Sequence, residues 1–216
     1  MASLIAASSL NNLSVYGSDG GTGNQILLMP KLQYRFRVEF FNFGFLDDSQ
    51  GSLALTRQIT DVTRPQVQFD DITLNVYNSR IFLAGKHTWQ PLTINVRDDA
   101  NGQVSKTVGQ QLQKQIDFVN QATAAAAGDY KFSTLIQILD GGNGVAAPIV
   151  LETWDLVGCY LQSANYQTLN YATSDVVTIA LTLKYDNAIQ TDAAGSTTVG
   201  VGETFTRTPG DLATNT

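Results

Sequence analysis

The amino-acid sequence predicts a mainly β protein of one large domain, with one helix packed on a sheet. Three observations support this expectation. Apolar and polar residues alternate with a period of two over several segments, as they do in strands with one buried face. Clusters of Gly, Asn, Asp and Ser separate these segments, as turn residues do. One segment alone repeats its apolar residues at helical spacing over several turns.

The first predicted strand runs from Lys31 to Phe41. Its alternating apolar residues are Leu32, Tyr34, Phe36, Val38 and Phe40. Residues 42–52 follow as a loop, in which Phe43 and Phe45 look exposed. A second strand is expected near Leu53–Ile59, ahead of the longest alternating block.

That block runs from Arg64 to Asp99 and predicts at least three consecutive strands. Its alternating apolar residues are Ile72, Leu74 and Val76, then Leu92, Ile94 and Val96. Turns are expected at Asn78-Ser79 and at Ala84-Gly85. The polar positions between the apolar ones carry small neutral or acidic side chains. Such a sheet can bury one side and leave the other in water.

The predicted helix runs from Val104 to about Ala125, and Gly128 is its stop signal. Its apolar residues recur at intervals of four and three, at Val104, Val108, Leu112, Ile116 and Val119. This spacing places them in one stripe, which predicts an amphipathic helix packed on the sheet.

The C-terminal half predicts strands again. Tyr130–Leu139 and Pro148–Leu161 flank a glycine-rich turn that begins at Asp140. The last predicted strand is Val176–Tyr185, and none is expected after Asp186.

These elements place one β domain at residues 30–190, between two segments of different composition. Residues 1–29 are rich in Ser, Ala, Asn and Gly, and we expect a flexible or partner-bound N-terminal arm there. Residues 191–216 are expected to form a polar C-terminal tail.

Composition excludes several classes of protein. The net charge of −6 disfavours non-specific DNA binding, because phosphates must be neutralised by Lys and Arg. Cys159 is the single cysteine, so no intrachain disulfide can form. The sequence contains no run of about 18 apolar residues, so no membrane span is indicated. Residues 1–30 lack the basic region of a signal peptide.

Residues suited to catalysis or metal binding form no recognisable pattern. His87 is the single histidine and lies outside any metal-ligand spacing, so we interpret it as a solvated turn residue. Gly85-Lys86 lacks the flanking residues of a phosphate loop. The doublets Asp70-Asp71 and Asp98-Asp99 are expected at strand ends, where turn capping explains them. We therefore expect no enzymatic activity, no cofactor and no metal ion.

The order of the segments resembles that of the tail tube proteins of contractile-tailed bacteriophages, which are similar to type VI secretion tube proteins. The resemblance covers about residues 31–190. It rests on LNVYNSRIFLAGKHTWQPLTINVRDD, VGQQLQKQIDFVNQA, YKFSTLIQILDGGNG, VLETWDLVGCYL and VTIALTLKYDNA, in that order. It implies a β-barrel-like sandwich with one flanking α-helix, whose sheets join those of neighbours into a ring-shaped large barrel. Such hexameric rings would stack into a hollow tube.

A water-filled bore for DNA requires small polar side chains that do not hold phosphate. On that basis we predict lumen-facing residues at Asp70, Asp71, Thr73, Asn75, Thr93, Asn95, Asp155, Thr178 and Thr182. Ring stacking requires segments that project along the axis. Our candidates for it are Phe43, Phe45, Leu46, Asp47 and Asp48, with the N-terminal arm as a second possibility.

The resemblance also implies partners. These are further copies of the chain, the tail sheath protein, the baseplate hub and tube initiator, the tape measure protein and the tail terminator. Double-stranded DNA would pass through without specific binding, and no membrane would be contacted. The location would be the virion tail tube, after synthesis in the host cytoplasm. Two alternatives stay open: the tube of a type VI secretion or extracellular contractile injection system, and a β-sandwich binding module.

Overall fold

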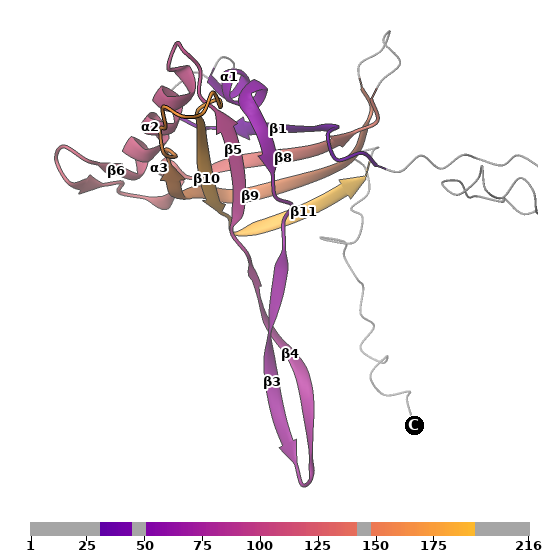
Figure 1. Ribbon diagram of the computed structural model, residues 1–216. Helices are drawn as coiled ribbons and strands as arrows, with labels where there is room; N and C mark the ends of the chain where they lie inside the picture. Colours follow the sequence, from indigo (N-terminus) through magenta and orange to yellow (C-terminus); the bar gives the residue numbers. More distant parts are fainter. Residues whose placement is uncertain (1–30, 45–50, 142–147, 193–216) are drawn as a thin grey trace, which may run out of the picture.

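A computed structural model describes residues 31–44, 51–141 and 148–192 (Figure 1). The strands in these ranges are β1 (Phe36–Phe41), β2 (Ile59–Val62), β3 (Val67–Val76), β4 (Ser79–Trp89), β5 (Leu92–Arg97), β6 (Ile116–Asp117), β7 (Ala122–Thr123), β8 (Phe132–Leu139), β9 (Val150–Asn165), β10 (Thr178–Lys184) and β11 (Asn187–Asp192). The helices are α1 (Gly51–Gln58), α2 (Gln103–Gln115) and α3 (Ala127–Tyr130). None of the helices in the described ranges has the length and apolar character needed to cross a membrane.

One antiparallel sheet forms the body of the fold. Its strand order is β1-β8-β9-β10-β5-β2, and β11 pairs with the first half of β9. The sheet curves around a core, but its end strands β1 and β2 do not pair with each other. The body is therefore barrel-like and open along one side, and the expected mainly β architecture is confirmed.

The core lies on the inner face of this sheet, under α1 and α2. In β5 the buried residues Leu92, Ile94 and Val96 alternate with half-exposed ones, as their spacing predicts. From α2, Val104 and Val108 close the core. The second acidic doublet follows the end of β5, as expected, and Asp99 accepts a hydrogen bond from the Val104 backbone nitrogen in the first turn of α2 at 3.3 Å.

Gly158 divides β9 into two halves. Leu156 and Cys159 are both fully buried although they are three residues apart, because the strand changes face between them. Gly158 has a φ of 71°, a conformation that L side chains rarely adopt. Before this point β9 pairs with β8 and β11, and after it β9 pairs mainly with β10.

Two predictions near the start of the domain are wrong, one about a strand and one about the exposure of a side chain. Residues 51–58 form helix α1 instead of a strand, and β2 begins only at Ile59. Short apolar runs do not distinguish a strand from a helix, and here Leu55 is fully buried from a helical position. Phe43 is also not exposed: its ring packs against Phe40 and Phe132 in the core.

The long helix ends earlier than predicted, at Gln115 instead of about Ala125. The Asp117 carboxylate accepts hydrogen bonds from the backbone nitrogens of Val119 and Asn120, which stabilises a turn that competes with the helix. Val119 is therefore 87% exposed instead of lying in the apolar stripe.

The C-terminal boundary also differs. β11 adds a strand after Asp186, where none was expected, and it extends to Asp192, inside the predicted tail. Alternation over so short a segment is weak, and β11 is fixed by its register with β9, in which Ala188 lies opposite Leu156.

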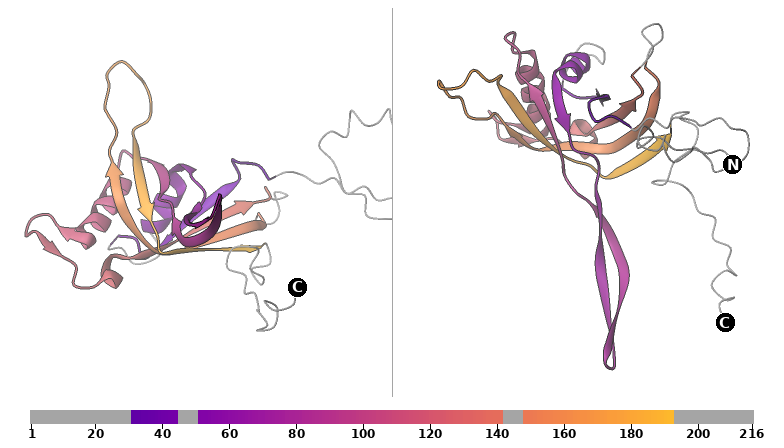
Figure 2. Two further views of the ribbon diagram at one scale, coloured as in Figure 1. Left: turned by 90° about the horizontal axis from the view of Figure 1, so that it is seen from below. Right: turned by 45° about the vertical axis from the view of Figure 1, so that its right-hand side comes forward.

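β3 and β4 form a long two-stranded hairpin that projects away from the body (Figures 1 and 2). Among the described strands they pair only with each other. The turn expected at Ala84-Gly85 is wrong, since both residues lie inside β4. Gly85 instead lies beside a bulge near Asp70, where an added Cβ would come within 2.8 Å of the Asp70 carbonyl oxygen.

Candidate functional site

The hairpin has one aliphatic face. The register places Ile72 opposite Leu83 and Leu74 opposite Ile81, and cross-strand partners share a face. These residues and Val76 form what we call the aliphatic face of the hairpin, and each of them is 45–49% exposed. An isolated two-stranded ribbon is marginally stable in water. A solvent-exposed aliphatic face on such a ribbon therefore indicates a surface that another molecule covers.

Three predicted lumen residues lie on the opposite face of the same hairpin. Asp71, Thr73 and Asn75 are exposed and lie opposite Ala84, Phe82 and Arg80. Asp70 is at the bulge next to them, so the first acidic doublet lies inside β3 and not at a strand end. The hairpin thus separates an aliphatic face from a mainly polar one.

A second group of predicted lumen residues is brought together on the outer face of the body. Thr93 on β5 lies directly opposite Thr182 on β10, and Asn95 lies opposite Ala180. Thr178 lies on the same face of β10, two positions before Ala180. Each of these predicted residues is half-buried. The sequence could show that they face away from the core, but not that β5 and β10 are neighbours.

Strand pairing extends this surface with residues that the sequence analysis missed. Asp61 on β2 accepts a hydrogen bond from the Asn95 side chain at 2.8 Å. Ser163 on β9 lies opposite Thr182. We call the surface formed by Asp61, Thr93, Asn95, Ser163, Asn165, Thr178 and Thr182 the polar face. Arg97 and Lys184 lie along its strands, so the charge of this face is not acidic, and small neutral groups dominate it.

The remaining predicted residues lie elsewhere. Asp155 is in the first half of β9, opposite Leu135 and Ile189, and is separated from the polar face by the Gly158 bulge. Phe43 is buried in the core. The other stacking candidates, Phe45, Leu46, Asp47 and Asp48, and the N-terminal arm lie outside the described residues.

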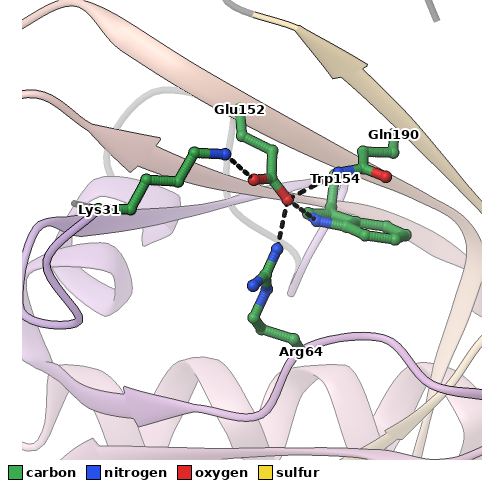
Figure 3. Close-up of polar contacts among 5 residues, drawn as sticks. All are labelled: Lys31, Arg64, Glu152, Trp154 and Gln190. Carbon is green, nitrogen blue, oxygen red and sulfur yellow. Dashed lines mark hydrogen bonds and ion pairs between the residues drawn. The ribbon is translucent and has the colours of Figure 1, made fainter. Parts of the chain in front are cut away.

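A buried carboxylate joins the root of the hairpin to the body (Figure 3). Glu152 on β9 is 4% exposed and forms ion pairs with Lys31 and Arg64. It also accepts hydrogen bonds from Trp154 Nε1 at 2.7 Å and Gln190 Nε2 at 2.9 Å. Arg64 lies just before β3, and Lys31 lies just before β1. Glu152 therefore connects four separate segments of the chain.

Opposing effects act on the pKa of Glu152. Burial raises it, but the hydrogen bonds from Lys31 and Trp154 and the positive charge of Arg64 outweigh burial. The net result is a pKa below the ordinary value of 4.5. The carboxylate is thus ionised at neutral pH, and sequence alone gave no signal for it because its cations are distant in the chain.

The structure shows little that is suited to catalysis. Within the described ranges, no three His, Cys, Asp or Glu side chains are grouped so that they could hold a metal ion. His87 lies in β4 instead of in a turn, beside the rings of Phe69 and Trp89. Burial raises the pKa of the Cys159 thiol to about 11, which disfavours the nucleophilic thiolate at neutral pH.

No protein-family model and no curated protein matches the sequence. Solved structures are similar in fold. A chain of the sheath/tube terminator of an extracellular contractile injection system, PVC, aligns with a TM-score of 0.56 at 14% identity, over 77% of this chain and 99% of its own. A chain of the PVC sheath-tube complex aligns with a TM-score of 0.52 at 15% identity, over 76% of this chain and 92% of its own. A chain of the anti-feeding prophage tube-terminating cap aligns with a TM-score of 0.52 at 14% identity, over 81% of this chain and 99% of its own.

Two of these structures come from an extracellular contractile injection system, and the third is a tube-terminating cap of the anti-feeding prophage. Because the identities are low, the similarity concerns the fold, and it covers almost the whole length of those chains. The expected likeness to tube proteins of contractile systems is confirmed at this level.

Proposed function

We propose that this chain is a structural tube subunit, which assembles into hexameric rings that stack into the inner tail tube of a contractile-tailed bacteriophage. The tube would conduct the genomic DNA during ejection, and the chain would carry out no catalysis. The observation that carries this proposal is the polar face, a continuous surface on which small neutral side chains from β5, β10 and β9 predominate and Asp61, Arg97 and Lys184 are the charged residues.

Physical reasoning relates this surface to a conduit. A lumen wall must stay hydrated and must offer few cations to DNA phosphates, because each phosphate contact slows passage. Thr, Asn and Ser side chains meet both requirements. With Thr93, Asn95, Thr178 and Thr182 in the wall, the hairpin residues Asp70, Asp71, Thr73 and Asn75 would extend it, and Asp155 stays a weaker candidate.

The proposed partners follow from this location. Further copies of the chain would form the ring and the stack, and the sheath, baseplate hub, tube initiator, tape measure protein and terminator would contact the tube. Synthesis would occur in the host cytoplasm, with assembly into the virion. Phe45, Leu46, Asp47, Asp48 and the N-terminal arm stay candidates for stacking contacts, whereas Phe43 could act only by holding that loop from the core.

A second candidate function is favoured by the similar structures. All three come from an extracellular contractile injection system or the anti-feeding prophage, so the tube of an extracellular contractile injection system or of a type VI secretion system is the main alternative. The two proposals differ in what passes through the bore, and a test of cargo separates them.

Imaging gives the first test. Electron microscopy of the purified chain, alone and with its native tail, should show stacked hexameric rings around an open bore. A chain located outside the channel, or one that is monomeric at every concentration and absent from the tail, would contradict the proposal.

The second test adds cations to the wall. Virions that carry Thr93→Lys and Thr182→Lys should assemble tubes but lose about tenfold or more in infectivity at low salt, because lysines in the bore retain phosphate. Gln103→Lys on the exposed start of α2 is the matched control and should have no effect. Asp71→Lys tests the hairpin in the same way. Unchanged DNA delivery at every salt concentration would show that the polar face does not line the bore.

A further inference from the structure

The open side of the body contains a groove with an apolar lining. It lies between the end strands β1 and β2 and has a volume of about 790 Å³. Four of the apolar side chains that line it are only half-buried, namely Phe36, Ile59, Val62 and Ile138. In the described part of the chain, β1 pairs only with β8, and β2 pairs only with β5. The groove is therefore an apolar space between two strands that have a neighbour on one side.

The charged side chains at the rim of the groove already have partners. These pairs are Lys31 and Arg64 with Glu152, Arg37 with Glu39, Arg35 with the Asp140 carbonyl oxygen, and Asp61 with Asn95. A charged occupant would therefore lose its hydration without gaining an unpaired partner, and this loss is costly. The groove suits an apolar segment that carries no charge.

The N-terminal arm contains such a segment next to the groove in sequence. Residues 26–29 are Ile-Leu-Leu-Met, and no charged residue occurs between Asp19 and Lys31. These four residues precede the described range, which begins at Lys31. Lys31 itself lines the groove, and its ammonium group is held by the buried Glu152 carboxylate (Figure 3). Because one residue spans at most about 3.6 Å, all four lie within roughly 18 Å of Lys31 and can reach the groove.

We propose that residues 26–29 fill the groove of their own chain as an extended segment between β1 and β2. Their apolar side chains would be buried against the half-buried residues of the groove, which removes both surfaces from water. A buried segment must also satisfy its backbone N–H and C=O groups. An edge strand can bind an added strand through its backbone, and both β1 and β2 are end strands of the sheet. The N-terminal arm thus closes the open side of the body.

The short tether favours the segment of the same chain over that of a second copy. Only Pro30 separates the segment from Lys31, which the ion pair with Glu152 holds at the groove. A short tether gives an effective concentration in about the millimolar range, whereas a second copy must first associate. The inference goes beyond the proposed tube function and does not depend on it. It uses only the last part of the arm, so residues 1–25 stay candidates for stacking contacts.

Thiol labelling tests whether the segment covers the groove. In the full-length chain with Val62→Cys, the new thiol should react slowly with a maleimide reagent. Replacing all four residues 26–29 by Ser should raise the labelling rate about tenfold, because the groove is then open to the reagent. The buried Cys159 does not interfere. The matched control replaces four apolar residues farther upstream by Ser and should leave the rate unchanged; these are Leu4, Ile5, Leu10 and Leu13.

Disulfide crosslinking tests whether the occupant belongs to the same chain. Leu27→Cys or Leu28→Cys, each combined with Val62→Cys in one chain, should form a disulfide within that chain. Adjacent residues of an extended segment point to opposite sides, so one of the two positions should crosslink clearly more than the other. A mixture of differently tagged chains, each with one of the two cysteines, should give little crosslink between chains.

The outcomes separate this inference from the proposed function. Equal labelling of position 62 in the two serine variants overturns the inference, and so does a crosslink that forms only between chains. Both results leave the tube function standing, because that function is decided by whether the unlabelled chain forms stacked rings. A protected groove in a chain that forms no rings would support the inference and contradict the tube function. Ile138→Cys on β8 provides a second groove position, and circular dichroism verifies that each variant is folded.

Discussion

Glu152 shows how one residue can fix the position of a distant element. Its carboxylate is buried, yet the two cations that bind it are about half exposed. Desolvation disfavours the ionised form, whereas the ion pairs and the Trp154 and Gln190 hydrogen bonds favour it. Because Arg64 immediately precedes the hairpin, this balance also sets where the hairpin leaves the body.

Replacing Glu152 by Gln should destabilise the fold. The variant keeps the shape but removes the charge, so we expect a loss of about 1–3 kcal/mol in the free energy of unfolding, limited because Lys31 and Arg64 can return to water. The measurement is urea unfolding followed by tryptophan fluorescence.

The loss should depend on pH in one direction. The pKa of Glu152 is lower in the folded chain than its ordinary value of 4.5, so the stabilisation is complete above that value. It disappears as the pH falls through the lower folded pKa, and there the wild type and Glu152→Gln should converge. The control is Glu39→Gln, whose ion pair with Arg37 is partly exposed to water and should contribute about 0–1 kcal/mol. An equal loss in both variants, or one that persists in acid, would refute this role for Glu152.

At the scale of single residues, the sequence predicted which side chains face the core better than it predicted which residues they contact. The period of two correctly separated the buried Ile94 from the half-exposed Asn95. It could not reveal that Asn95 bonds Asp61, or that Glu152 meets Lys31 across more than a hundred residues of chain. Such contacts depend on which distant strands pair with each other, and the local alternation of residues does not show this pairing.

At the scale of elements, β9 depends on one glycine. At Gly158 the backbone has positive φ, and an added Cβ would collide with the Asp186 carboxylate. The bulge at this position lets β9 change its pairing partners while keeping Leu156 and Cys159 in the same core.

Two alanine substitutions should therefore have opposite effects. Gly158→Ala should lower the free energy of unfolding by about 1–3 kcal/mol, because it introduces a strained φ and a collision. Gly109→Ala, in α2 with open space around it, should raise the free energy of unfolding by up to about 1 kcal/mol through helix propensity. Thermal and chemical unfolding of both variants provide the measurement. A neutral Gly158→Ala would show that the bulge is not required.

The elements that were mispredicted are either short or end where a local side-chain interaction competes with the regular structure. α1 and β11 have too few residues for their period to be read, and tertiary packing of Leu55 and Ala188 decides their form. The end of α2 was missed because the Asp117 turn is a side-chain effect superimposed on a helical pattern. The strands β3, β5 and β10 were predicted because their alternation extends over six or more residues, and β8 was predicted from the glycine-rich turn that follows it.

At the scale of the whole molecule, the chain consists of a curved body and a projecting hairpin. The body has a buried core, whereas β3 is exposed along its whole length. The body can therefore stabilise itself, and the hairpin needs a partner to cover its aliphatic face. This division of roles is expected of a subunit that is stable alone but is completed by assembly.

Shortening the hairpin tests this division. We expect a variant in which Asn-Gly replaces residues 70–86, joining the cross-strand pair Phe69 and His87, to retain the fold of the body. Its melting temperature should stay within about 4 °C of the wild type, because the removed residues contribute little to the core. It should nevertheless fail to form tubes, since it can no longer reach the next copy. A matched variant with only Thr73→Ser, on the opposite face, should assemble normally. Calorimetry and electron microscopy measure the two properties separately, and tubes formed by the shortened chain would show that stacking depends on other surfaces.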